Sequence, residues 1–148
     1  MALLIATPAW GWQCQAAVLR VHDGDTLTVR CEGRGPQKIR IANIDAPELH
    51  QSFGPASKQA LETTVSGQAI LVDAQAVDRY QRVVARIVVG STDLGLALVA
   101  QGGAWCGLRP TAACKRAQAD ARQARIGLWA EPDPLPPWRW RRAHPRRD

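Results

Sequence analysis

The chain has 148 residues, of which 46% are hydrophobic and 22% are charged, and its formal net charge at pH 7 is +6. This length suits one domain and leaves little room for a second, and the apolar fraction is enough for a real core, so the chain need not be disordered. The positive charge favours nucleic acid as a partner, although a basic surface without any partner has the same composition. No segment has the roughly 20 apolar residues of a transmembrane helix, so we expect no membrane insertion.

Residues 1–11 (MALLIATPAWG) contain an apolar run and end on the small-x-small pattern Ala9-Trp10-Gly11. This pattern is typical of a secretory signal peptide. The run is short and no positive charge precedes it, so the segment is either a truncated leader or an ordinary first strand.

The four cysteines are even in number and none has the C-x-x-C spacing of zinc or thioredoxin-like sites. Disulfides are typical of such a chain in an oxidising compartment, and four cysteines allow three pairings. We expect Cys14–Cys31, which flank one predicted hairpin, and Cys106–Cys114, which lie close in sequence. Four free thiols in a cytosolic protein are the alternative. Together with the leader, the cysteines favour a secreted or periplasmic protein.

The first predicted elements form a β-hairpin. Residues 17–22 and 25–30 flank Asp23-Gly24, a dipeptide typical of two-residue turns with positive φ at both central positions. Strict alternation predicts one buried face, made of Leu19, Val21, Leu27 and Val29, and Asp25 shares its parity.

The remaining elements follow from turn residues, caps and periodicity. We expect, in order, a strand over 38–44, a helix from Gly54-Pro55 to Gly67, strands over 69–73 and 83–89, a helix over 93–101 with Asp93 as N-cap, and a helix from Thr111 to about Arg125. This order predicts an α+β, mainly β protein with a five-stranded OB-type barrel and three helices, in a domain over residues 12–131. The Pro- and Arg-rich residues 132–148 are expected to form an extended basic tail lying on or off that domain.

Three stretches combine charged residues with turn signals: residues 21–26 (VHDGDT), 40–48 (RIANIDAPE) and 78–82 (DRYQR). In content, order and spacing they resemble the staphylococcal nuclease family, and the resemblance covers residues 18–129. It implies a calcium-dependent endonuclease that hydrolyses phosphodiester bonds in DNA or RNA and leaves 3′-phosphate ends. We expect a monomer whose partner is its nucleic acid substrate.

The resemblance implies a cation held by Asp25, Asp45 and the backbone carbonyl of Ala46. Carboxylate and carbonyl oxygens with added waters suit Ca²⁺, which accepts six to eight oxygen ligands. The alternatives are a turn residue at Asp25 and a strand terminator at Asp45.

Arg40 and Arg82 match the arginines that bind the phosphate, because a planar guanidinium pairs with two phosphate oxygens and stabilises developing charge there. Glu48 matches the catalytic glutamate, which takes a proton from water or orients that water. Surface ion pairs and a loop glutamate are the alternatives. In a straight strand Arg40 and Asp45 would face opposite ways, so we predict a break between Ala42 and Asp45.

Arg79 and Tyr80 match positions that contact the terminal phosphate of bound nucleotides in the family, and Gln81 stands where the family often has glycine. Trp105 either stacks on a base or belongs to the core. Two other functions stay open: a noncatalytic nucleic-acid-binding module of the same fold, and an OB-fold protein that binds anionic surfaces through its basic tail.

Overall fold

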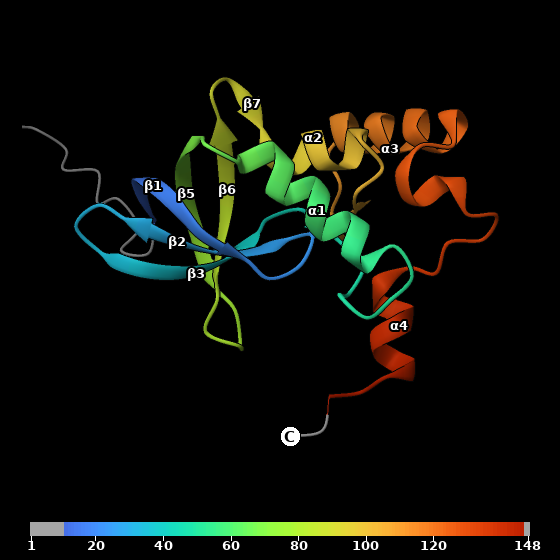
Figure 1. Ribbon diagram of the computed structural model, residues 1–148, viewed down its shortest axis with the longest axis horizontal. Coiled ribbons are helices and arrows are strands. Elements are labelled where there is room, and N and C mark those ends of the chain that lie inside the picture. The colour runs from blue at the N-terminus through green and yellow to red at the C-terminus, as the bar shows by residue number, and fades with distance from the viewer. Residues whose placement is uncertain (1–10, 147–148) are drawn as a thin grey trace, which may run out of the picture.

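The computed structural model describes residues 11–146, and a five-stranded closed barrel forms one side of the molecule (Figure 1). Its strands are β1 (Trp12–Val21), β2 (Thr26–Cys31), β3 (Gly35–Ile41), β5 (Ala69–Val77) and β6 (Val83–Val89). Neighbouring strands pair antiparallel in the order β3-β2-β1-β5-β6, and the parallel pairing of β3 with β6 closes the barrel. The predicted OB-type barrel is therefore confirmed.

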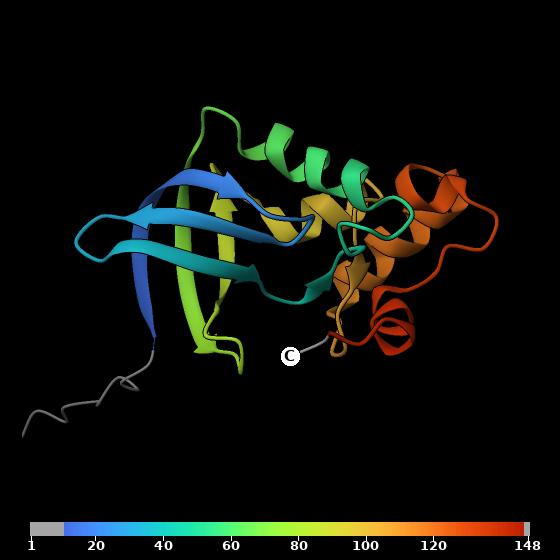
Figure 2. The ribbon, with the colours of Figure 1, turned by 60° about the horizontal axis from the view of Figure 1, so that its bottom comes forward.

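Short strands and helices gather at one end of this barrel (Figure 2). The strands are β4 (Ile44–Asp45), β7 (Thr92–Asp93) and β8 (Trp105–Cys106), and the helices are α1 (Gly54–Val65), α2 (Leu94–Ala100), α3 (Ala112–Ala124), the 3-10 helix η1 (Gly127–Ala130) and α4 (Pro137–Ala143). Asp93 and Thr111 accept backbone N–H bonds from Leu96 and Cys114, so both predicted N-caps are confirmed. Within residues 11–146, no helix has the length and apolar character needed to cross a membrane.

The fourth α-helix, α4, lies in the segment that we expected to be extended. Pro137 occupies the first turn of α4, where proline has a suitable φ and lacks an N–H that would be unpaired there in any case. Pro137 is buried, and the Trp138 ring lies edge-on to the Trp105 ring with 5.4 Å between centroids. Docking of this segment on the domain therefore stabilises a helix that is too short to persist alone.

The alternation predicted for β1 changes phase at Leu19. The β1–β2 register shifts between Val18 and Arg20, which leaves Leu19 46% exposed while Val21 is buried. A β-bulge adds one residue to a strand and so reverses the faces beyond it. The prediction that Leu19 is buried is therefore wrong, whereas Leu27, Val29 and Asp25 are buried as expected.

The β1–β2 connection is a four-residue loop, residues 22–25, and not the predicted two-residue turn. Neither Asp23 nor Gly24 has a positive φ. Gly24 is needed for a different reason: a Cβ there would overlap the Ser57 hydroxyl on α1 and the methyl group of Ala46. The loop thus packs tightly onto α1 and fixes the position of Asp25, the residue that follows Gly24.

Two disulfides join neighbouring elements. Cys14–Cys31 links β1 to β2, and Cys106–Cys114 links β8 to α3. Both are the expected pairs, and no cysteine among the described residues is free.

The core fills the barrel, and its most deeply buried side chains include Leu27, Val29, Ile39, Ile70, Val72 and Ile87. A second apolar cluster, formed by Ala121, Leu128 and Trp129, packs against Phe53 and Trp105. The Trp105 and Trp129 rings meet edge to face with 4.3 Å between their centroids. Trp105 therefore belongs to this cluster, which is the core alternative stated for it above.

Candidate active site

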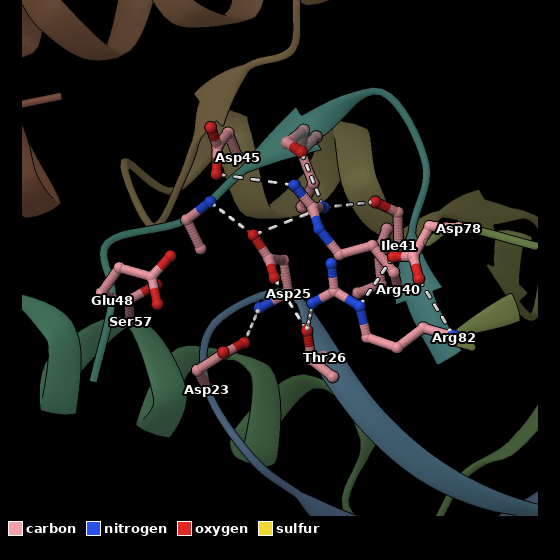
Figure 3. A network of polar contacts seen from close by, with 12 residues as sticks. Asp23, Asp25, Thr26, Arg40, Ile41, Asp45, Glu48, Ser57, Asp78 and Arg82 are labelled. Carbon is pink, nitrogen blue, oxygen red and sulfur yellow. Dashed lines mark hydrogen bonds and ion pairs between the residues drawn. The ribbon is translucent and has the colours of Figure 1, made fainter. Parts of the chain in front are cut away.

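A polar pocket of about 870 Å³ opens between residues of the barrel and residues of the C-terminal segment. It is lined by the sequence-predicted side chains Asp25, Arg40, Asp45, Glu48, Arg79, Tyr80 and Arg82, together with Asp23 and residues of the C-terminal segment. Barrel closure thus brings three separate stretches of sequence to one pocket (Figure 3).

Asp25 is the most deeply buried of these groups, at 5% exposed. Its Oδ2 accepts the Ala46 N–H at 2.7 Å and lies 3.4 Å from Arg40 Nη1, while its Oδ1 accepts the Thr26 hydroxyl at 3.0 Å. Burial raises the pKa of the Asp25 carboxyl to about 7, against the opposing effects of Arg40 and the Ala46 N–H. A nearby positive charge would stabilise the ionised form of the Asp25 carboxyl, which burial disfavours.

The strand that carries Arg40 breaks before Asp45, as predicted. β3 ends at Ile41, β4 begins at Ile44, and Asn43 between them has φ 67°. Arg40 Nη1 bridges the break by donating to the carbonyl oxygens of Ile41 and Ile44, each at 2.8 Å.

The break turns Asp45 into the same pocket as Arg40, although the two have opposite parity. Arg40 Nη2 lies 3.5 Å from Asp45 Oδ1. Asp45 pairs with Trp105 in the antiparallel β4–β8 ladder, and this pairing fixes the backbone of the strand that carries the Asp45 carboxylate.

Arg82 reaches the pocket from the β5–β6 loop, where Asp78 holds it. Asp78 Oδ2 accepts from Arg82 Nε at 2.8 Å, and Asp78 Oδ1 accepts the backbone N–H groups of Tyr80 and Arg82. Gln81 has φ 63°, a left-handed conformation that glycine adopts with less strain. Figure 3 shows the Arg40 and Arg82 guanidinium groups on the same side of Asp25.

Asp78 is a residue that the sequence analysis did not assign to the site. Partial burial alone would raise its pKa, but hydrogen bonds from Arg82 and from the Tyr80 N–H outweigh burial and lower the pKa of the Asp78 carboxyl. The signal that could have found it is its position at the start of DRYQR, four residues before Arg82.

Arg79 and Tyr80 lie at the outer rim of the pocket, and both are exposed. The Arg79 guanidinium carbon lies 5.0 Å from the centroid of the Tyr80 ring. The C-terminal segment reaches the same ring, because the Arg146 guanidinium carbon lies 5.0 Å from its centroid.

Arg141 on α4 is a second residue that the sequence analysis missed. Its Nη1 and Nη2 donate to Asp45 Oδ1 and Oδ2 at 3.0 and 2.8 Å, and Nη1 also donates to Glu48 Oε1 at 3.0 Å. Hydrogen bonds to Asp45 and then to Glu48 raise the pKa of the Arg141 guanidinium, so it is always charged. No local pattern in the arginine-rich C-terminus marks which arginine makes this contact.

The donor set fits a hard divalent cation. Asp25 and Asp45 both border the pocket, and both also lie within 3.5 Å of Arg40. Within residues 11–146, no group of three or more His, Cys, Asp or Glu side chains could hold a metal by itself. A cation here would therefore take two carboxylates from the protein and draw its other ligands from a backbone carbonyl and water, which Ca²⁺ tolerates.

A closed OB-type barrel whose pocket joins carboxylates to two arginines has the features of a phosphodiester-cleaving enzyme. Residues 38–131 match the family described as staphylococcal nuclease homologues, and the chain belongs to this family. The family and the enzyme class expected from the sequence are thus confirmed. The protein is a nuclease that hydrolyses phosphodiester bonds of nucleic acid, and nucleases of this family generally depend on a metal ion.

Curated relatives match nearly the whole chain. It is 36% identical over 160 aligned positions to "Protein ParB" of Escherichia coli, covering 99% of this chain and 89% of that protein. It is 34% identical over 156 positions to a micrococcal nuclease of Shigella flexneri, covering 97% and 88%. An uncharacterized endonuclease of Haemophilus influenzae is 38% identical over 127 positions, covering 84% and 71%.

Proposed function

We propose that the protein is a Ca²⁺-dependent endonuclease that cuts DNA, RNA or both and leaves 3′-phosphate ends. The observation that carries the proposal is the single pocket in which Asp25, Asp45 and Glu48 lie beside Arg40 and Arg82. These side chains provide a cation site, a proton acceptor and two phosphate-binding guanidinium groups in one pocket.

In the proposed site, Asp25, Asp45 and the Ala46 carbonyl hold the cation. The ion would supply Lewis-acid polarisation of a phosphate oxygen. The fit is supported by the burial of Asp25 and by the strand break that turns Asp45 towards it.

Arg40 and Arg82 bind the phosphate oxygens and stabilise the negative charge that grows on them during attack. Their positions are held by contacts outside the substrate: Arg40 by two backbone carbonyls, and Arg82 by Asp78. Fixed donors of this kind need little reorganisation during the reaction.

Glu48 takes a proton from the attacking water or orients that water. Water attacks phosphorus in line, and the bond to the 5′ oxygen breaks so that phosphate stays on the 3′ side. Arg79 and Tyr80, at the rim, contact the terminal phosphate of the bound nucleotide.

We further propose that the protein is secreted or periplasmic and acts as a monomer. The two disulfides support an oxidising compartment. The expected leader over residues 1–11 lies almost wholly outside the described residues, and the nuclease domain over 12–131 with its basic tail over 132–148 stays a prediction.

The test is cleavage of supercoiled DNA and of RNA by wild type and by Glu48→Gln, in Ca²⁺ and in excess chelator. Loss of a general base should reduce turnover by about 10²–10⁴-fold, and chelation should abolish cleavage. The matched control is Glu62→Gln on the exposed face of α1, where Glu62 pairs with Lys58 across 3.7 Å. Cleavage that survives both the chelator and Glu48→Gln would refute the proposed mechanism.

A further inference from the structure

The contact between α4 and the site links groups 93 and 96 positions apart in the chain. Arg141 makes a two-pronged contact with the Asp45 carboxylate and a third bond to Glu48. Side-chain ion pairs with this geometry are directional and stronger than simple charge attraction, because two parallel N–H bonds form at once.

This contact uses the oxygens that a cation would need. Both Asp45 oxygens accept from Arg141, and Oδ1 also lies 3.5 Å from Arg40 Nη2. A divalent cation on Asp45 would compete for the same lone pairs and would stand beside the positive charge of Arg141. Binding of the guanidinium at Asp45 and binding of a cation there therefore weaken each other.

The C-terminal segment is docked across the mouth of the pocket at several points. Gln51 donates to the Leu135 carbonyl, and Trp138 packs against Trp105. Beyond α4, Arg146 lies over the Tyr80 ring. The segment thus runs from Gln51, just before α1, to the Tyr80 rim and lines the pocket between them.

The same segment is suited to release. α4 has seven residues, far fewer than an isolated helix needs in water. The Arg141 side chain is 41% exposed, so it can leave the carboxylates without opening the core. Charge exchange at Asp45 therefore removes the ionic contacts of Arg141 and leaves only the apolar contacts of Pro137 and Trp138 to hold α4.

We propose that α4 is an autoinhibitory latch, in which Arg141 occupies Asp45 and Glu48 until a divalent cation displaces it. This inference rests on the proposed cation site. The latch lowers the apparent affinity for the cation, because only the undocked fraction of molecules can bind it. The released arginines of α4 would then face the phosphates of the substrate, which favours the open state further.

The test is calorimetric titration of Ca²⁺ into the full chain, without nucleic acid, for wild type, Arg141→Gln and Arg139→Gln. Arg139 is exposed on the same helix and has no side-chain hydrogen bond or ion pair to any residue in the described range, so it controls for loss of one charge. We expect Arg141→Gln to bind Ca²⁺ at least about threefold more tightly than Arg139→Gln.

Hydrogen exchange supplies a readout that does not depend on activity. The Trp140 and His144 amides donate to the Pro136 and Trp140 carbonyls in the docked segment. Adding Ca²⁺ to wild type should speed their exchange several-fold, whereas in Arg141→Gln they should exchange fast before Ca²⁺ is added.

The outcomes separate the latch from the proposed function. Equal Ca²⁺ affinity in all three proteins, or weaker binding by Arg141→Gln, overturns the latch and leaves the cation site standing. Unchanged amide exchange on saturation with Ca²⁺ also overturns it. Absence of Ca²⁺ binding in every protein overturns the latch together with the calcium part of the proposed function.

Discussion

The fold shifts the pKa values of two carboxyl groups at the site in opposite directions. Burial raises the pKa of Asp25 to about 7, so the ionised form is held against a desolvation cost that a nearby cation offsets. Asp78 has a lowered pKa because Arg82 and backbone N–H groups favour its charged form. The stability that ionised Asp78 contributes is fully present above its ordinary pKa of 3.8 and is lost as the pH falls through its lowered value.

Asp78 is a positioning residue for Arg82, and Asp78→Asn tests this role. The substitution keeps an oxygen for the backbone N–H groups but removes the charged acceptor of Arg82 Nε. We expect kcat to fall by about ten- to a hundredfold, because a displaced guanidinium no longer matches the phosphate.

The measurement is steady-state cleavage of an oligonucleotide with kcat and KM resolved separately. Asp93→Asn is the matched control, because Asp93 accepts from Arg86 Nε at the same 2.8 Å but lies away from the pocket. Asparagine also keeps its role as the N-cap of α2. A fall in kcat of similar size in both variants would contradict a specific role for Asp78.

At the scale of elements, the site depends on short segments that interrupt regular strands. The loop between β1 and β2 carries Asp25, and the break between β3 and β4 carries Asp45 into the pocket. The loop is pressed against α1 at Gly24, and the Ala46 methyl group approaches the same side of this glycine. The relative position of the two carboxylates is thus set by packing of a glycine between a helix and a loop.

Gly24→Ala should destabilise the fold and weaken the site together. The added methyl group would overlap Ser57 and Ala46, and overpacking of this kind costs about 1–3 kcal/mol. Urea denaturation followed by tryptophan fluorescence measures the loss. Gly11→Ala is the control, because a Cβ there would meet its nearest atom, the Ala74 carbonyl oxygen, at an ordinary 3.8 Å. Equal stability of the two variants would show that the loop has room to move.

At the scale of the molecule, closure of the barrel by β3 and β6 brings the pocket together. Arg40 pairs with Val84 in that parallel ladder, and Arg82 directly precedes β6. The disulfides cross-link elements of this arrangement. Cys14–Cys31 joins two barrel strands, and Cys106–Cys114 joins α3 to β8, the partner of the strand that holds Asp45.

Removal of Cys14–Cys31 by a double substitution to alanine should lower the free energy of unfolding by about 3 kcal/mol. The estimate follows from the chain entropy that a cross-link of 17 residues removes from the unfolded state. Chemical denaturation under non-reducing conditions measures the change. Reductant should destabilise wild type more than the double variant, and an equal effect on both would contradict the prediction.

Much of the fold follows from local patterns. The caps at Asp93 and Thr111, the proline start of α1 and the strand over 83–89 depend on interactions within a few residues, so they could be predicted directly. The phase change at Leu19 could not, because a bulge depends on how β1 pairs with its neighbours. Gly24 was predicted as a turn residue, whereas the contact that requires it comes from α1.

The sequence by itself determined the barrel, the disulfide pairs and those charged residues of the pocket that lie in three short motifs, because each is encoded in alternation, spacing or a short motif. Only the tertiary structure decided how those groups meet: that Asp78 holds Arg82, that Asn43 turns Asp45 beside Arg40, and that Arg141 reaches Asp45. The physical reason is distance along the chain. An ion pair between residues 96 positions apart exists only after the barrel closes and the C-terminal helix docks, and no local pattern specifies either event.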